Sequence, residues 1–408
     1  MCSWRRVLLL VCLGHSSIFA QIDPVPRQLL QFGYNGALQG HAPISVYAFY
    51  YYNKPQFLET NLTLRLAIAP TWLDSELGIS HVLGQNTDLG IGIAGGGFGD
   101  SYYEIRKGKF LPEESFIGHG GDVNLSLYHL FNPGARIPLN GVLRGTAHYT
   151  LFDRDDQTAR AFKVPDDQGV LGVRTGLRWG GREPTLFPSL AMELSIWYEG
   201  KFRSEADSYG YATNSLSGDR SVKPQSHLFW GEALLAYTME KSKHSFYLSM
   251  TAGTSIDADR FSAYRLGALL PLVSEFPLSL PGYYFQEISA QRFILFGGNY
   301  IVPLDARQRW NINGTIATAL VDYLPGLEQP GTSHTGLGVG LLYKTSTWKV
   351  MVGYGYGVDA IRSGGRGAHS IGLLMQLDME HARSKLFNPD QPGLWPGIQR
   401  VLGTFGSW

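Results

Sequence analysis

Apolar and polar residues alternate strictly in this sequence, over stretches of about ten residues that recur along the chain. The stretch from 61 to 68 shows the pattern, because every second position is apolar: Leu62, Leu64, Leu66 and Ile68. Successive side chains of a β-strand point to opposite faces. The alternation therefore predicts long strands with one apolar and one polar face, and no stretch indicates a helix.

These strands are too long for an ordinary soluble β-protein. Strands of soluble sandwiches usually have about five or six residues, whereas strands that cross a membrane need about ten. The chain also has 50 Gly, 22 Tyr, 21 Phe and 9 Trp with only 17% charged residues, a composition typical of barrel strands with aromatic girdles. We expect an all-β fold, a single antiparallel transmembrane β-barrel. A soluble β-protein is the alternative.

The connections between these stretches alternate in length. The short ones are 53–60, 84–87, 132–139, 180–184, 241–244, 303–308 and 344–347, and the long ones are 98–121, 153–168, 201–223, 255–285, 322–334 and 357–367. Short periplasmic turns and long extracellular loops alternate in this way in bacterial barrels. With a first strand near Phe32 and a last one at 368–379, we predict about sixteen strands and both ends of the barrel in the periplasm.

The chain begins with a pattern typical of a signal peptide. Arg5 and Arg6 precede an apolar run from Val7 to Leu13, and small residues lead up to Ala20. We predict a signal peptide at 1–20, a barrel at 21–380 and a periplasmic tail at 381–408. Export to the bacterial outer membrane follows, and both cysteines, Cys2 and Cys12, would be removed with the signal, although Cys12 leaves a lipoprotein site as an alternative.

Composition also bears on ligands and partners. The 34 basic residues balance 34 acidic ones, so the chain offers no basic surface for nucleic acid. We expect no cofactor and no metal. The expected partners are the lipid bilayer, lipopolysaccharide and the outer-membrane assembly machinery, with a separate periplasmic partner as a further possibility.

Several charged residues fall on the polar face of the predicted strands and would point into the lumen. They are Arg65, Arg144, Arg174, Arg178, Glu193, Glu199 and Glu232. Such charges could set the ion selectivity of an open channel, or they could pair across a narrow lumen, because an unpaired buried charge is costly. We favour the paired network.

No catalytic site is expected. A barrel hydrolase would need a nucleophile and a base on neighbouring positions, and Ser126, His129 and His148 are the candidates. Ser126 and His129 have opposite parity on their strand, and no GxSxG motif occurs. We predict that the chain is not an enzyme.

Three short motifs in the C-terminal half carry a family resemblance. They are AYRLGA at 263–268, LPGYY at 280–284 and FGGNYIVPL at 296–304. This region resembles the BamA-type superfamily of bacterial surface antigen barrels. The resemblance implies sixteen strands and a loop after strand eleven that folds into the lumen, with Arg265 and Gly267 as its anchor.

The sequence departs from the family in three places. Leu266 separates Arg265 from Gly267, whereas the family has Gly directly after Arg. Asn311 and Asn313 stand where the family carries an acid that pairs with the loop arginine. Only about ten residues lie between Gln21 and the first strand, so we expect the N-terminal periplasmic domains to be lacking.

The last strand contains Gly372, Met375 and Leu377, which resemble the C-terminal assembly signal of the family. The tail after it could be a periplasmic plug or an anchor. The resemblance implies a role in outer-membrane protein assembly, secretion or transport. A porin-like diffusion channel is the alternative, and an outer-membrane barrel hydrolase is the third hypothesis.

Overall fold

The computed structural model describes residues 23, 25–43, 45–181, 187, 191–211, 220–268 and 278–386. The predicted signal peptide and residues 387–408 of the predicted tail lie outside the described residues.

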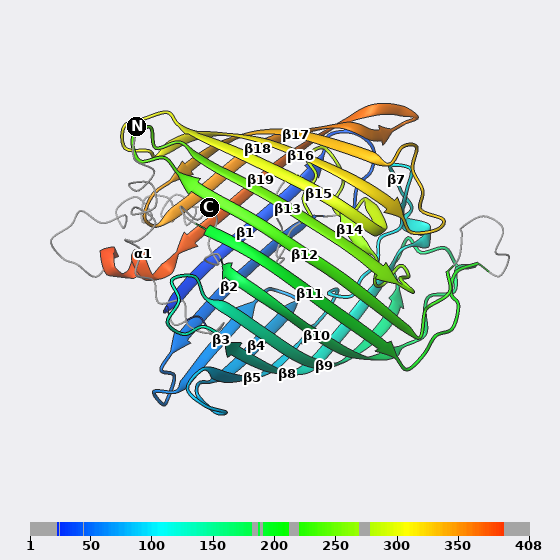
Figure 1. The fold of residues 1–408 in the computed structure, drawn as a ribbon. Helices are drawn as coiled ribbons and strands as arrows, with labels where there is room; N and C mark the ends of the chain where they lie inside the picture. Colours follow the sequence, from blue (N-terminus) through cyan, green and yellow to red (C-terminus); the bar gives the residue numbers. More distant parts are fainter. Residues whose placement is uncertain are drawn as a thin grey trace, which may run out of the picture.

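Sixteen antiparallel strands form a closed barrel (Figure 1). They are β1 (Arg27–Ala37), β2 (Val46–Pro55), β3 (Leu62–Ile68), β4 (Trp72–Ile79), β5 (Thr87–Gly96), β8 (Phe116–Leu130), β9 (Leu139–Arg154), β10 (Gln168–Gly181), β11 (Ala191–Arg203), β12 (Gln225–Thr238), β13 (Ser245–Ile256), β15 (Ile288–Pro303), β16 (Trp310–Tyr323), β17 (Ser333–Lys344), β18 (Trp348–Arg362) and β19 (Gly365–Asp378). Each strand pairs with the next, and β19 closes the barrel on β1 from Leu29 opposite Asp378 to Ala37 opposite Ser370. The predicted sixteen-stranded barrel is confirmed.

Smaller elements lie at the two ends of the barrel. At the end that carries the long loops are β6 (Ile105–Arg106), β7 (Lys109–Phe110), the 3₁₀ turn η2 (Pro112–Glu114) and β14 (Tyr264–Leu266). The helix α1 (Met379–Leu386) follows β19 at the opposite end (Figure 1), which contains the start of β1 as well. Within the described residues no helix has the length and apolar character needed to cross a membrane.

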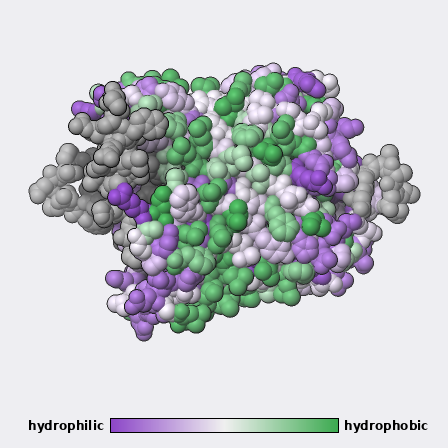
Figure 2. All heavy atoms as spheres, in the orientation of Figure 1, coloured by the Kyte–Doolittle hydropathy of each residue, from purple (hydrophilic) through white to green (hydrophobic). Residues whose placement is uncertain are grey.

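The alternation in the sequence becomes an outer and an inner face. On β11, Ile196 is 61% exposed whereas its neighbour Ser195 is 2% exposed. The same contrast recurs around the barrel, and Figure 2 shows hydrophobic residues across the middle of the wall with hydrophilic residues gathered towards its ends. Tyr300 and Trp310 expose their rings at the periplasmic end of this wall, where aromatic girdles normally lie.

Several predicted loops were wrong at their boundaries, and two of them differ most from the structure. The loop expected at 357–367 is a tight turn of Ser363 and Gly364, because β18 continues to Arg362. The loop expected at 98–121 ends at Ser115, because the glycine-containing segment after Phe116 pairs with β9 as regular strand. In both places glycines suggested a loop. On β18 a glycine is needed for another reason, since Gly357 faces the ring of Tyr283 inside the barrel.

The expectation that the chain has no helix was also wrong, because the short helix α1 follows β19.

Candidate functional site: the lumen and its inward loop

The longest connection, residues 257–287 between β13 and β15, enters the barrel, and we call it the lumen loop. Its residues 269–277 lie outside the described residues. The first half forms β14, which pairs with the start of β15 from Tyr264 opposite Ala290 to Leu266 opposite Ile288. β14 thus occupies the edge of β15 beyond the end of β13, and its Tyr264 hydroxyl donates hydrogen bonds to the carbonyl oxygens of Phe229 and Thr254.

Arg265 and Gly267, the candidate anchor, lie on and just after β14. The Arg265 guanidinium donates to the carbonyl oxygens of Tyr103 at 2.8 Å and Gln286 at 2.9 Å, and it stacks over the ring of Tyr102 at 4.8 Å. Gly267 has φ +147°, and a Cβ atom there would overlap the carbonyl of Tyr284. Only glycine fits this turn without strain.

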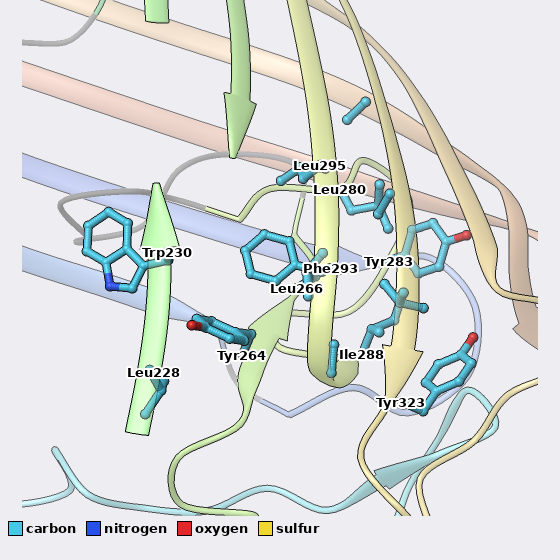
Figure 3. Close-up of a cluster of buried hydrophobic side chains, with 14 of the residues drawn as sticks. Leu228, Trp230, Tyr264, Leu266, Leu280, Tyr283, Ile288, Phe293, Leu295 and Tyr323 are labelled. Carbon is cyan, nitrogen blue, oxygen red and sulfur yellow. The ribbon is translucent and has the colours of Figure 1, made fainter. Parts of the chain in front are cut away.

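Residues 280–284 in the second half of the lumen loop are buried against the inner wall. Leu280 and Tyr283 are 0% exposed and pack in a cluster with side chains of β12, β15 and β16 (Figure 3). Leu228, Trp230, Phe293, Leu295 and Tyr323 supply the wall side of this cluster. Burying this much apolar surface stabilises the loop in its inward position.

An ion pair ties the end of the lumen loop to β18, three strands further along the barrel wall than β15. The Glu287 carboxylate accepts hydrogen bonds from Arg362 of β18 at 2.7 and 2.8 Å, and both side chains are almost completely buried. Glu287 also accepts the backbone N–H of Tyr284 at 2.7 Å. The Arg362 guanidinium stacks over the Tyr284 ring at 3.6 Å. A buried charge pair of this kind is costly to break by removing one partner.

Sequence reasoning missed both of these residues. Arg362 fell in a predicted loop, and Glu287 stood next to the start of a strand without any local sign of a partner. The charges are also reversed with respect to the family expectation, since here the loop supplies the acid and the barrel wall supplies the arginine.

A cap lies at the mouth of the barrel and is built from the segments 97–115, 155–167, 204–211 and 220–224, together with 257–268 of the lumen loop. Apolar side chains of the cap, Tyr102, Phe162, Tyr209 and Val222, form one cluster with Phe116 of β8 and Phe152 of β9, and Phe261 packs against it. The hairpin of β6 and β7 reaches the end of β18, where Gly108 lies against the Ile361 carbonyl. The cap therefore extends across the barrel mouth.

A buried acid holds the cap together. Glu104 is 0% exposed and pairs with Arg260 at 3.2 Å and Arg220 at 3.3 Å, while the Tyr102 hydroxyl donates to it at 2.8 Å. Burial by itself would raise the pKa of the Glu104 carboxyl, but the two arginines and the hydrogen bonds outweigh it and hold the pKa below its ordinary value.

The candidate lumen charges occur in pairs along the inner wall. Arg65 lies 3.3 Å from Asp74 on β4, and Arg144 on β9 donates to Glu76 at 2.8 Å. The hydroxyl of Tyr128 also bonds to Glu76 and accepts from Arg144.

A second group of charges lies on β10 to β12. Arg174 is 3.4 Å from Glu199, and Arg178 is 3.1 Å from Glu193. Both guanidinium groups lie over the ring of Trp197, at 4.5 and 5.3 Å. The last candidate, Glu232, is buried on β12 opposite Ser195 of β11.

The fold is similar to those of solved outer-membrane barrels. CdiB from Acinetobacter baumannii has 12% identity and a TM-score of 0.52, with 86% of this chain and 60% of that chain covered. BamA from Haemophilus ducreyi lacking POTRA domains 1–3 has 10% identity and a TM-score of 0.54, with 86% and 70% covered. CdiB from Escherichia coli has 12% identity and a TM-score of 0.53, with 87% and 63% covered.

The resemblance to BamA-type barrels is thus confirmed at the level of the fold. This chain spans about three fifths of the length of the two CdiB proteins. No protein-family model matches the sequence, and no curated protein matches it. The barrel fold and its apolar outer wall support an outer-membrane barrel.

The three residues that resemble an assembly signal lie on the strand that closes the barrel. On β19, Gly372 pairs with Asn35, Met375 with Phe32 and Leu377 with Leu30, all on β1. Gly372 has inward parity, whereas Met375 and Leu377 share the outward parity of Ile371, which is 40% exposed.

The hydrolase candidates lie in separate hydrogen-bond groups. The Ser126 hydroxyl accepts from Arg144 at 2.7 Å, and His129 bonds to Thr87 at 2.9 Å. His148 bonds to Asp100 at 2.8 Å and to Thr150. In the described part of the chain no group of three or more His, Cys, Asp or Glu side chains is arranged to hold a metal.

Proposed function

We propose that this chain is a gated translocation barrel of the outer membrane, acting in outer-membrane protein assembly, secretion or transport. The observation that carries the proposal is the ion pair between Glu287 and Arg362, which fixes the lumen loop to β18. A diffusion channel would need an unobstructed path, whereas here the lumen loop packs against the inner wall and the cap lies across the barrel mouth. The likeness to BamA and CdiB barrels supports the same reading.

Passage through such a barrel requires the lumen loop to move. The loop is held by apolar packing of Leu280 and Tyr283 and by the Glu287–Arg362 pair, so a partner or client that displaces the loop has to break both. We expect a periplasmic partner or the arriving client to supply this free energy through contacts that only the open state offers.

Single-channel conductance in a planar bilayer tests the gate. We compare the full chain with Glu287→Gln, with a deletion of 265–284, and with Glu328→Gln as a control. Glu328 is an exposed acid in the loop 324–332 whose hydrogen bonds stay within that loop.

The full chain and the control should give small, flickering currents. Glu287→Gln should give longer openings, because Arg362 then lacks its buried counter-charge, and the deletion should give a large steady current. A large steady current from the full chain would instead favour a porin-like diffusion channel.

Membrane insertion has a simple test. The folded barrel should migrate differently in unboiled and boiled samples on a detergent gel. Purification without detergent, with identical migration of the two samples, would contradict a transmembrane barrel.

A further inference from the structure

A cavity of about 790 Å³ lies in the lumen directly below the cap. It is bounded by the inner faces of β9, β10 and β11 and by the β14 half of the lumen loop. Six basic side chains line it, namely Arg144, Arg174, Lys201, Arg203, Arg260 and Arg265. Only two carboxylates line it, Asp100 and Glu199, and one histidine, His148. Basic side chains therefore outnumber carboxylates at the cavity wall.

Four of the six cations are neutralised by acids. Arg174 pairs with Glu199, which also lines the cavity, and the other three pair with acids that do not line it. These pairs are Arg144 with Glu76, Arg203 with Asp259 and Arg260 with Glu104. The remaining wall acid, Asp100, bonds to His148 at 2.8 Å. The cavity acids are thus already engaged.

The other two cations, Lys201 and Arg265, form no ion pair with any described carboxylate. Glu199, Asp259 and Asp100 act electrostatically on Lys201, but they are paired with Arg174, Arg203 and His148. Arg265 uses one nitrogen for two backbone carbonyls, and its buried Nε–H has no acceptor among the described residues. An uncompensated charge in a partly buried site is costly.

The cavity also has an apolar side. Aromatic rings of Tyr102 and Phe261 from the cap and of Trp230 from β12 line it, and Phe285 of the lumen loop completes it. Ligand sites typically combine such an apolar wall with a few placed polar groups.

We propose that this cavity binds a phosphate dianion, either free or as the headgroup of a small organic phosphate monoester. Lys201 and Arg265 supply the counter-charge for the phosphate oxygens, since ammonium and guanidinium donors match phosphate charge and geometry. The aromatic side receives the organic part of a monoester. The proposal concerns the closed, loop-filled barrel and does not depend on what the barrel translocates.

Calorimetric titration of the purified full chain in detergent tests the site, with inorganic phosphate and phenyl phosphate as separate probes and sodium chloride as the reference anion. The variants are Lys201→Gln and Arg265→Gln. The control is Lys163→Gln, which removes the same charge from the exposed loop 155–167, where Lys163 pairs with Asp166 at 2.8 Å.

We expect one phosphate per chain, with binding weakened about tenfold or more by either cavity substitution and unchanged in the control. Tighter binding of phenyl phosphate than of inorganic phosphate would identify the monoester as the natural class, and the reverse order would identify free phosphate. The proposal is overturned if the full chain does not bind phosphate in preference to chloride, or if Lys201→Gln binds it like the full chain. These readouts are independent of channel conductance, so a failure here leaves the gating proposal unaffected.

Discussion

Gly282 of the lumen loop lies so close to Gly357 of β18 that a Cβ atom on Gly282 would overlap the Gly357 backbone amide. The two glycines let the loop backbone contact the barrel wall directly. The Gly282 N–H donates to the Ser370 hydroxyl on the next strand, and Pro281 lies against Gly336 on β17. The loop backbone therefore contacts three neighbouring strands, β17, β18 and β19.

Gly282→Ala should destabilise the inward position of the lumen loop by about 1–3 kcal/mol, because the added methyl group overlaps the wall and the residue has positive φ. The expected result in planar bilayers is more frequent and longer openings. Gly331→Ala is the matched control, since Gly331 has φ +88° but open space around its Cβ position. Equal currents from both variants would show that backbone strain alone, and not contact with β18, caused the effect.

Protonation of the Glu104 carboxylate at low pH should open the cap. Its pKa in the closed cap lies below the ordinary value of 4.5, so its stabilising contribution is fully present above that value and is lost as the pH falls through the lowered pKa. We expect cleavage by pepsin within 97–115 to rise steeply only at the acid end of a series from about pH 5 to pH 2.

Two variants check the assignment to Glu104. Glu104→Gln removes the carboxylate that pairs with both Arg260 and Arg220, so this variant should be cleaved throughout the series, with little pH dependence. Glu328→Gln should keep the steep dependence of the full chain. A Glu104→Gln variant with the pH profile of the full chain would contradict the prediction.

A charge on the outer wall should be far more damaging than the same charge at a turn. Leu248 on β13 is 53% exposed on the apolar outer face, and Leu83 in the turn after β4 is 66% exposed. Leu248→Lys should lower the free energy of unfolding in lipid vesicles by roughly 2–4 kcal/mol. Leu83→Lys should change it by less than about 0.5 kcal/mol. Urea titrations of both refolded variants measure the difference, and similar values would place Leu248 outside the membrane.

The pair of Glu76 and Arg144 should show strong coupling. Removing one partner leaves the other charge in a largely buried place, so Glu76→Gln alone should cost roughly 1–3 kcal/mol. Adding Arg144→Gln should recover part of this loss. A double-mutant cycle from urea unfolding gives the coupling, and purely additive effects would argue against a direct interaction.

Local pattern was enough to predict the barrel, because side-chain parity along a strand depends only on neighbouring residues. It placed Leu194 and Ile196 outside and Glu193 inside without knowledge of any partner strand. Strand ends were less predictable where glycines occur. The sequence around β18 does not show that Gly357 makes room for the lumen loop, which comes from another part of the chain.

The candidate site was harder to predict for the same reason. Lys201 was assigned to the loop 201–223, although β11 continues to Arg203 and points Lys201 into the lumen cavity. Glu287 and Arg362 are 75 residues apart, and only the closed barrel brings them together. The pairs between adjacent strands, such as Arg174 with Glu199, follow from register, which parity alone does not determine.

The contacts of the lumen loop also constrain the order of assembly. The Tyr284 hydroxyl donates to the Gln39 carbonyl, 245 residues away, in the loop that joins β1 to β2. Contacts so distant in sequence generally form late. The loop can take its final place only after the first and last strands have met, so each newly inserted barrel should pass through a stage in which it leaks ions before it seals itself.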